Sequence, residues 1–198
     1  MTDSAGGPLI MITGGVRSGK SSYAEQLAAE NGRPYIYLAT ARVEDEAMFE
    51  RVLRHQNRRP DSVKTVEEPL EPHLVLEREG TAGKVILVDC LTLLISNRFL
   101  ADLDRHGAVR EGEDIFADEL LLEEAAGRTL DYISLFAAAA AKSEAAVIVV
   151  TNEVGMGVVP EYPVGRVYRD LAGRANQLMA QAADQVWFVV CGLPQRFK

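Results

Sequence analysis

The chain has 198 residues, of which 47% are hydrophobic and 25% charged, and its formal net charge is −8. This composition is typical of a globular domain, and the acidic balance argues against nucleic acid or an anionic membrane surface as a partner. The sequence shows neither a signal-peptide pattern nor an apolar run as long as a membrane span, so we expect a cytoplasmic protein without membrane insertion. Two cysteines, Cys90 and Cys191, lie in apolar strand-like segments, which predicts buried thiols rather than a disulfide.

The first predicted elements flank a glycine-rich loop. Leu9–Thr13 is an apolar run of strand length, and Ser21–Asn31 has helical spacing. The loop that joins them matches the phosphate-binding pattern G-x-x-x-x-G-K-[ST] at every fixed position: Gly14, Gly15, Val16, Arg17, Ser18, Gly19, Lys20 and Ser21. The strand and helix on either side disfavour the alternative, a glycine-rich turn that matches by accident. We therefore predict a nucleoside triphosphate site in which Lys20 reaches the β- and γ-phosphates and Ser21 binds Mg²⁺.

The rest of the chain continues the alternation of strands and helices. Further strands are predicted at Tyr35–Ala39, Val85–Val88, Val147–Thr151 and Val186–Val190. Further helices are predicted at Asp45–Arg58, within Ile115–Ala141 and at Val167–Ala183, and the polar stretch Asp102–Asp114 is predicted as a surface loop or helix lead-in. This pattern predicts one α/β domain over residues 1–198, with a flexible start at residues 1–8. Its sheet should be mainly parallel with helices on both faces, and ligands should bind at the carboxyl ends of the strands.

A second nucleotide signal follows the strand at Val85–Val88. The strand ends at Asp89, as expected of a Walker B acid, which in a P-loop fold lies beside the phosphate loop and holds Mg²⁺ directly or through water. In the segment that follows, Thr92 is better explained by helix packing. For Asn97 a structural and a functional role are equally compatible with the pattern.

One of the three histidines, His55, lies in a basic helical pattern. Arg51, His55 and Arg58 share one side of the predicted helix. An imidazole among guanidinium groups tends toward its neutral, nucleophilic form, and the arginines would neutralise a phosphate bound there. A solvent-exposed basic helix face that includes a histidine explains the same pattern, and the pattern by itself favours it. The other two, His73 and His106, are predicted as exposed surface residues.

Polar residues also follow the strand at Val147–Thr151. Glu153 could act as a base or order the magnesium shell, and a turn at the edge of the core with a solvated glutamate is an equal alternative. Further polar residues lie along the next helix and could bind phosphate or a second subunit, although a structural ion-pair network is the simpler interpretation: Arg166, Arg169, Asp170, Arg174 and Asn176.

Together these segments resemble the bifunctional adenosylcobinamide kinase / adenosylcobinamide-phosphate guanylyltransferase family of cobalamin biosynthesis. The resemblance covers most of the chain and rests on residues 14–21, 37–41, 51–60, 65–69, 88–93 and 151–177. The first segment would admit many nucleotide-binding enzymes, whereas the last is the most specific to this family.

The resemblance implies a RecA-like P-loop fold, a homo-oligomer such as a trimer, and two reactions with ATP or GTP. In the first, the nucleotide phosphorylates the aminopropanol hydroxyl of adenosylcobinamide. In the second, GTP guanylylates a histidine with loss of pyrophosphate, and the GMP passes to adenosylcobinamide phosphate to give adenosylcobinamide-GDP. The resemblance assigns the histidine to His55, against the exposed-face interpretation. Some members carry two adjacent histidines where this chain has Arg54 and His55.

The resemblance also implies nucleotide contacts outside the phosphate loop, at Ala39, Thr40, Ala41, Gln56, Asn57, Arg58, Glu67 and Asp89. It implies Mg²⁺ held by Ser21 and Asp89. One pocket must then present the γ-phosphorus in one step and the α-phosphorus in the other, which a mobile His55 helix would allow. Two rival functions are another small-molecule P-loop kinase with a structural His55, and a nucleotide-gated switch that binds GTP without transferring it.

Overall fold

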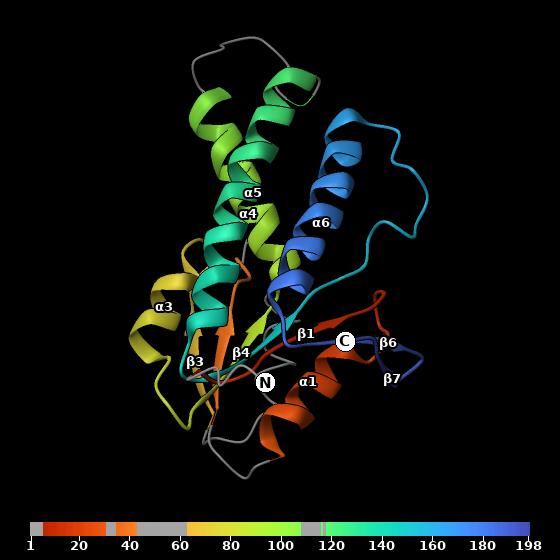
Figure 1. The fold of residues 1–198 in the computed structure, drawn as a ribbon. Coiled ribbons are helices and arrows are strands. Elements are labelled where there is room, and N and C mark those ends of the chain that lie inside the picture. Colours follow the sequence, from red (N-terminus) through yellow and green to blue (C-terminus); the bar gives the residue numbers. More distant parts are fainter. Residues whose placement is uncertain (1–5, 31–34, 43–62, 108–115, 117) are drawn as a thin grey trace.

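The computed structural model describes residues 6–30, 35–42, 63–107, 116 and 118–198. Within them lies a seven-stranded sheet of order β3-β2-β4-β5-β1-β6-β7 (Figure 1). Neighbouring strands from β3 to β6 are parallel, and β7 runs antiparallel beside β6. The strands are β1 Leu9–Thr13, β2 Ile36–Ala39, β3 Lys64–Glu67, β4 Val85–Asp89, β5 Ala146–Val150, β6 Gln185–Val190 and β7 Leu193–Arg196. The helices are α1 Lys20–Ala29, α3 Pro72–Glu79, α4 Leu91–Gly107, α5 Glu119–Lys142 and α6 Pro163–Ala182.

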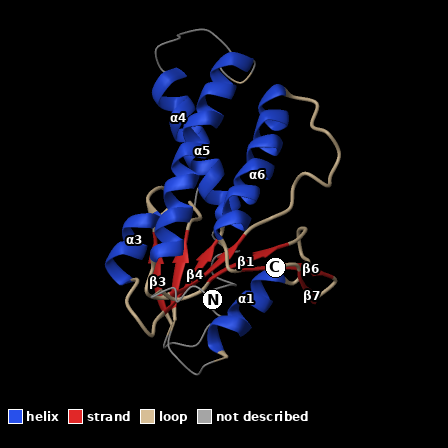
Figure 2. Ribbon diagram, viewed as in Figure 1, coloured by secondary structure: helices blue, strands red, loops and turns tan. Residues whose placement is uncertain are grey.

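Helices cover both faces of this sheet. Figure 2 shows α1 on one side and α3, α4, α5 and α6 on the other. The side chains of β1 alternate between two cores: Leu9 packs in the cluster that includes α4, α5 and α6, and Ile10 packs in the cluster that includes Ala24 and Ala28 of α1. All five residues of β1 are buried, because a central parallel strand has both faces covered. The predicted RecA-like P-loop α/β fold is confirmed in its sheet and its layers.

Local sequence explains where several helices begin. The Asp118 carboxylate accepts a hydrogen bond from the Leu121 N–H at 3.0 Å, which caps α5. Helices α3 and α6 begin at Pro72 and Pro163, where the missing N–H of proline would have no partner in the helix.

Each predicted strand is confirmed to within a residue or two, as is the helix that became α1. The helix predicted at Val167–Ala183 is confirmed as α6, which begins four residues earlier, at Pro163. The helix expected at Asp45–Arg58 lies outside the described residues. The sequence analysis missed β3, α3 and β7, because β3 and β7 are short, largely exposed edge strands and α3 is only two turns long.

The prediction of a loop or helix lead-in at Asp102–Asp114 is wrong for its first part, which belongs to α4. Leu103 is fully buried, and the Asp102 carboxylate accepts from the Arg128 guanidinium of α5 at 2.9 Å. One apolar side chain and one interhelical ion pair hold this polar segment in the helix. Residues 108–115 lie outside the described part of the chain.

Two further surface predictions are also wrong. Cys90 is buried as expected, but Cys191 is exposed, because the backbone turns with a positive φ of 52° at the end of β6. His73 is only half-exposed: its Nδ1 lies 3.0 Å from the Tyr132 hydroxyl, and the two rings meet edge to face. His106 is exposed as predicted. In the described part of the chain, no helix has the length and apolar character needed to cross a membrane.

Candidate nucleotide-binding site

Parallel pairing brings the carboxyl ends of β1, β5, β4, β2 and β3 to one edge of the sheet. The phosphate loop leaves β1 at Thr13, and Asp89 ends β4. Strand β5 lies between them, so Asp89 is one strand farther from the loop than a direct neighbour would be. Helix α1 packs against β1, β5 and β4, which places its first turn, with Lys20 and Ser21, across this interval.

Steric fit explains the two fixed glycines of the phosphate loop. A β-carbon on Gly14 would lie 2.4 Å from the carbonyl oxygen of Val189 on β6. A β-carbon on Gly19, the N-cap of α1, would lie 3.1 Å from the Cα of Gly192. Any side chain at Gly14 would therefore push the loop off β6. The tip of the loop, at Val16 and Arg17, is exposed.

The lysine of the loop is buried, with 8% of its surface exposed. Its ammonium donates a hydrogen bond to the carbonyl oxygen of Gly15 at 3.0 Å. A buried ammonium must be compensated by negatively charged or polar oxygens, and a phosphate bound at the amino-terminal end of α1 would supply them. The hydroxyl oxygens of Thr13 and Ser18 are buried and have no hydrogen-bond partner among the described residues. Both hydroxyls are therefore available to form a hydrogen bond with a ligand.

The carboxylate of Asp89 is fixed by a neighbouring strand. Its Oδ2 accepts a hydrogen bond from the hydroxyl of Tyr37 on β2 at 2.6 Å, and Tyr37 is itself buried. The hydroxyl of Ser21 and the carboxylate of Asp89 are hard oxygen donors of the kind that bind Mg²⁺. In the part of the chain that the structure describes, no three His, Cys, Asp or Glu side chains are grouped so that they could hold a metal ion.

Thr40, at the end of β2, holds the end of β4 in place. Its hydroxyl donates to the Cys90 carbonyl at 2.7 Å and accepts from the Cys90 N–H at 2.8 Å. Its own N–H donates to the Asp89 carbonyl at 3.1 Å, and its carbonyl accepts from the Asn97 amide at 2.7 Å. Thr40 is completely buried, so its polar groups position Asp89. The sequence pattern left the role of Asn97 undecided between structure and function. Its amide also donates to the Pro69 carbonyl at 3.1 Å, so it links the ends of β2 and β3 and has a structural role.

The Cys90 thiol next to Asp89 has no nucleophilic character at neutral pH. Burial and, to a smaller extent, the nearby Asp89 carboxylate raise the pKa of this thiol to about 12.

A buried polar network anchors the segment after β5. The Thr151 hydroxyl donates to Asn176 Oδ1 at 2.8 Å, and the Asn176 amide donates to the Asn152 carbonyl at 3.1 Å. The Asn152 N–H donates to the Thr92 hydroxyl at 2.7 Å, and the Tyr168 hydroxyl donates to the Thr92 carbonyl at 3.0 Å. Thr92 thus has the packing role that its pattern favoured. Asn176 belongs to this network, which ties β5 to α4 and α6.

The charged candidates near this segment lie closer to the surface. The Glu153 carboxylate accepts from the Gly155 N–H at 3.0 Å, and the Glu153 N–H donates to the Gly14 carbonyl at 3.1 Å. Arg169 pairs with Asp170 at 3.2 Å, and Arg166 lies 3.6 Å from Glu119, which fits the structural ion-pair interpretation.

The remaining predicted contacts divide into two groups. Ala39 and Ala41 are half-buried on either side of Thr40, and Glu67 is exposed at the end of β3. The other predicted residues lie outside the described part of the chain: His55, Gln56, Asn57 and Arg58. Tyr37 lies in the segment 37–41 that carries the resemblance, but its hydrogen bond to Asp89 was not predicted. Gly192 was missed altogether, since a glycine after a strand carries no motif.

These features define a P-loop nucleotide-binding protein of the α/β class: a phosphate loop follows the first strand, a Walker B acid lies two strands away, and helices cover both faces of the sheet. The model of the family described as cobinamide kinase / cobinamide phosphate guanyltransferase matches residues 10–197. The chain therefore belongs to this family, and the resemblance found in the sequence is confirmed.

Relatives of similar length support this membership. The chain is 40% identical over 191 residues to the bifunctional adenosylcobalamin biosynthesis protein CobP of Pseudomonas aeruginosa, covering 95% of this chain and 96% of the relative. It is 35% identical over 190 residues to the bifunctional adenosylcobalamin biosynthesis protein CobU of Escherichia coli, covering 96% and 99%. Among solved structures, the flagellar accessory protein FlaH from Methanocaldococcus jannaschii is similar with a TM-score of 0.42 at 15% identity, over 96% of this chain and 76% of that one.

Proposed function

We propose that this chain is a bifunctional enzyme that phosphorylates adenosylcobinamide and then transfers GMP from GTP to adenosylcobinamide phosphate. The observation that carries the proposal is the match of one family over residues 10–197. Two relatives of nearly the same length are named bifunctional adenosylcobalamin biosynthesis proteins. The proposed enzyme is one domain, works as a homo-oligomer such as a trimer and functions in the cytoplasm.

In the kinase step, the phosphate loop binds the β- and γ-phosphates of ATP or GTP. The backbone N–H groups of residues 14–21 and the Lys20 ammonium contact phosphate oxygens, which offsets the charge that builds up as the γ-phosphoryl group leaves the diphosphate. The aminopropanol hydroxyl of adenosylcobinamide accepts that group. Ser21 and Asp89 would hold Mg²⁺, which supplies further neutralisation of the triphosphate.

In the transferase step, the same loop makes pyrophosphate a stabilised leaving group. The His55 imidazole attacks the α-phosphorus of GTP, the bond to the bridging oxygen breaks and a GMP–histidine forms. Gln56, Asn57 and Arg58 contact this nucleotide, as do Ala39, Ala41 and Glu67 at the carboxyl edge. Thr40 is fully buried and both of its backbone polar groups are hydrogen-bonded, so its part in nucleotide binding would be to hold Asp89 in place. The phosphate of adenosylcobinamide phosphate then displaces the imidazole and gives adenosylcobinamide-GDP.

Labelling with two forms of GTP tests both steps. With the α-phosphate labelled, wild-type protein should acquire an acid-labile, alkali-stable label, and His55→Ala should acquire none. His106→Ala is a matched control, since His106 is exposed and contacts only Asp102 among the described residues. With the γ-phosphate labelled, the label should appear in adenosylcobinamide phosphate.

Each outcome of the labelling has a definite meaning. If label appeared in the corrinoid but not on the protein, the protein would be a P-loop kinase in which His55 has a structural role. If GTP were hydrolysed slowly and neither the protein nor the corrinoid were labelled, the protein would be a nucleotide-gated switch. Either result would refute the bifunctional assignment.

A further inference from the structure

The turn between β6 and β7 lies against the phosphate loop, although no motif marks it. The N–H of Gly192 in this turn donates a hydrogen bond to the carbonyl oxygen of Ser18 at 2.8 Å. The Cα of Gly192 is also the atom nearest to a β-carbon placed on Gly19. Just before the turn, the fully buried Val189 faces Gly14 and Gly19. The phosphate loop thus rests on the end of β6 at both of its fixed glycines.

The geometry of the peptide bond turns this contact into an orienting device. In a planar trans peptide, the carbonyl of one residue and the N–H of the next point in opposite directions. The carbonyl of Ser18 is held by Gly192 on the outer side of the loop, so the N–H of Gly19 points to the inner side, where a phosphate would bind. A flipped peptide would aim the Ser18 carbonyl at the phosphate, and the partial negative charge on its oxygen would repel the ligand.

A second external donor acts on the other end of the loop in the same way. The N–H of Glu153, in the segment after β5, donates to the carbonyl of Gly14 at 3.1 Å, which directs the N–H of Gly15 to the opposite side. Within the loop, the carbonyl of Gly15 accepts from the Lys20 ammonium and from the Ser18 N–H. The peptides on both sides of the loop tip are therefore oriented by donors that lie outside the motif.

We propose that Gly192 is a positioning residue of the nucleotide site, which orients the Gly19 N–H toward the bound phosphate through its hydrogen bond to Ser18. The inference rests on the proposed function, because it requires that the loop binds a nucleoside triphosphate. The β6–β7 turn is then part of the binding site without touching the ligand. It also gives the carboxyl-terminal hairpin a role in nucleotide affinity.

A backbone ester tests this hydrogen bond without changing any side chain. Cys191 allows residues 191–198 to be joined, as a synthetic peptide, to a thioester of residues 1–190. In the test protein, glycolic acid replaces Gly192, so an oxygen stands where the N–H was. The control protein carries the same ester change at Phe197, whose N–H donates to the Val186 carbonyl, also at 2.8 Å, in the same hairpin. An all-amide protein assembled in the same way is the reference.

The inference is tested by measuring the GTP dissociation constant and the melting temperature of each of the three proteins. Both esters should lower the melting temperature by a similar amount, because each removes one backbone hydrogen bond. The ester at Gly192 should also weaken GTP binding about fivefold relative to the reference, whereas the ester at Phe197 should leave it unchanged. Equal GTP affinity in the two ester proteins would overturn the inference while leaving the proposed function intact. A reference protein that does not bind GTP would refute the proposed function itself.

A recombinant pair of variants gives the same test in the ribosomally made protein. Gly192→Ala keeps the N–H, and its β-carbon would meet no atom within 4 Å, although the positive φ of 79° makes the backbone strained. Gly192→Pro removes the donor, and its ring also excludes the positive φ that the turn has here. We expect both variants to be destabilised and only Gly192→Pro to bind GTP more weakly. An equal loss of GTP affinity in the two variants would count against the inference.

Discussion

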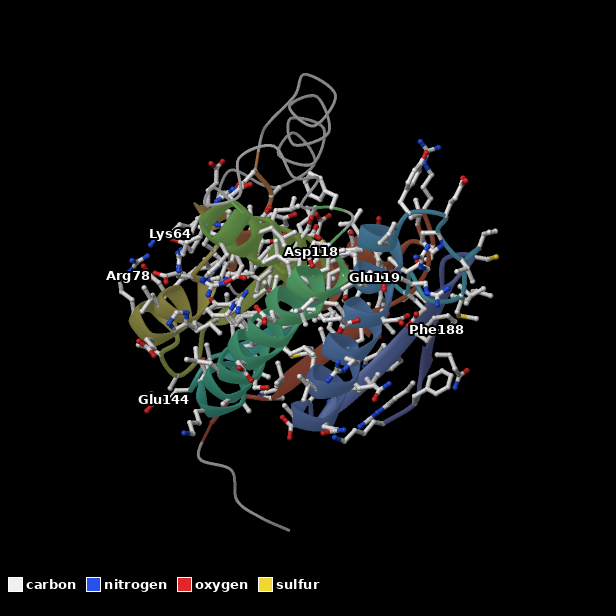
Figure 3. The ribbon with its side chains drawn as sticks, turned by 90° about the horizontal axis from the view of Figure 1, so that it is seen from above. Lys64, Arg78, Asp118, Glu119, Glu144 and Phe188 are labelled. Carbon is white, nitrogen blue, oxygen red and sulfur yellow. The ribbon has the colours of Figure 1, made fainter. Side chains whose placement is uncertain are left out.

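Around the phosphate loop, on the β1 and β6 side of the sheet, the hydrogen bonds that come from neighbouring segments are backbone to backbone. Around Asp89, on the β2 and β4 side, side-chain hydroxyls add to one backbone hydrogen bond from Thr40. Gly192 and Glu153 reach the loop carbonyls with their N–H groups. Asp89, by contrast, is placed by the hydroxyls of Tyr37 and Thr40. Figure 3 shows Lys64 and Arg78, beyond the β2 and β4 side, at one edge of the molecule and Phe188 of β6 at the other.

The difference follows from what each side must do. A triphosphate needs many donors that converge on one point, and successive backbone N–H groups of a tight loop supply them. A carboxylate that holds a metal ion needs one fixed direction, and a hydrogen bond from a neighbouring strand supplies it. We therefore expect substitutions on the loop side to change nucleotide binding, and substitutions on the Asp89 side to change the metal requirement.

The largest effect is expected on the loop side, from Lys20→Ala. This change removes the buried ammonium that would contact the β- and γ-phosphates, so the rates of both kinase and guanylyl transfer should fall about 100- to 1,000-fold. Initial rates with labelled GTP measure it. The control is Lys84→Ala, whose exposed ammonium lies 3.6 Å from Glu79 at the other edge of the sheet. Wild-type rates in the Lys20 variant would contradict the assignment of the loop.

A smaller and more selective effect is expected from Tyr37→Phe on the Asp89 side. Loss of the 2.6 Å hydrogen bond leaves the carboxylate without its orienting partner, and the Mg²⁺ concentration needed for half-maximal GTP binding should rise about tenfold. Calorimetric titration of GTP at a series of Mg²⁺ concentrations measures this shift.

The matched control for Tyr37 is Tyr168→Phe, which also removes a tyrosine hydroxyl that donates to an oxygen near the site, here from a half-buried residue. The Tyr168 variant should lose stability without a change in Mg²⁺ requirement. If the two variants showed the same Mg²⁺ dependence, the hydroxyl of Tyr37 would have a merely structural role.

The same contrast explains how much of the site the sequence could predict. The loop side follows from local rules, since the spacing of Gly14, Gly19 and Lys20 fixes a turn and the start of a helix within a few residues. The Asp89 side depends on Thr40 and Asn97, which meet only after β2 has paired with β4 and α4 has formed. The resemblance predicted a nucleotide contact at Thr40, but no local pattern indicated its contact with Asn97. Gly192 is the limiting case, because its role comes from a contact with a residue more than 170 positions away in the sequence.

The fold itself was more predictable than its edges. Buried central strands such as β1 and β5 are continuous apolar runs, so their positions could be predicted to within one residue. Edge strand β3 has mostly exposed residues, and the proline in β7 obscures a strand pattern, so neither could be recognised. The prediction that Cys191 is buried in a strand was wrong for a related reason. Strand β6 ends at a backbone turn, and no change in hydropathy marks this end in the sequence.

The smallest effect is expected farthest from the loop, where Glu79 of α3 joins Lys64 of β3 at 2.8 Å. The hydrogen bond from Lys64 lowers the pKa of Glu79, so the pair stabilises the fold above the ordinary glutamate pKa of about 4.3 and loses this contribution as the pH falls through the lower value in the folded state. The melting temperature of wild type should thus fall more steeply below about pH 4.3 than that of Glu79→Gln. Glu144→Gln, at an exposed position, should keep the wild-type slope. Because this ion pair lies at the β3 edge of the sheet, away from the phosphate loop that follows β1, GTP affinity should be the same in all three proteins at neutral pH. A change of affinity in Glu79→Gln would show that the two sides of the sheet are coupled.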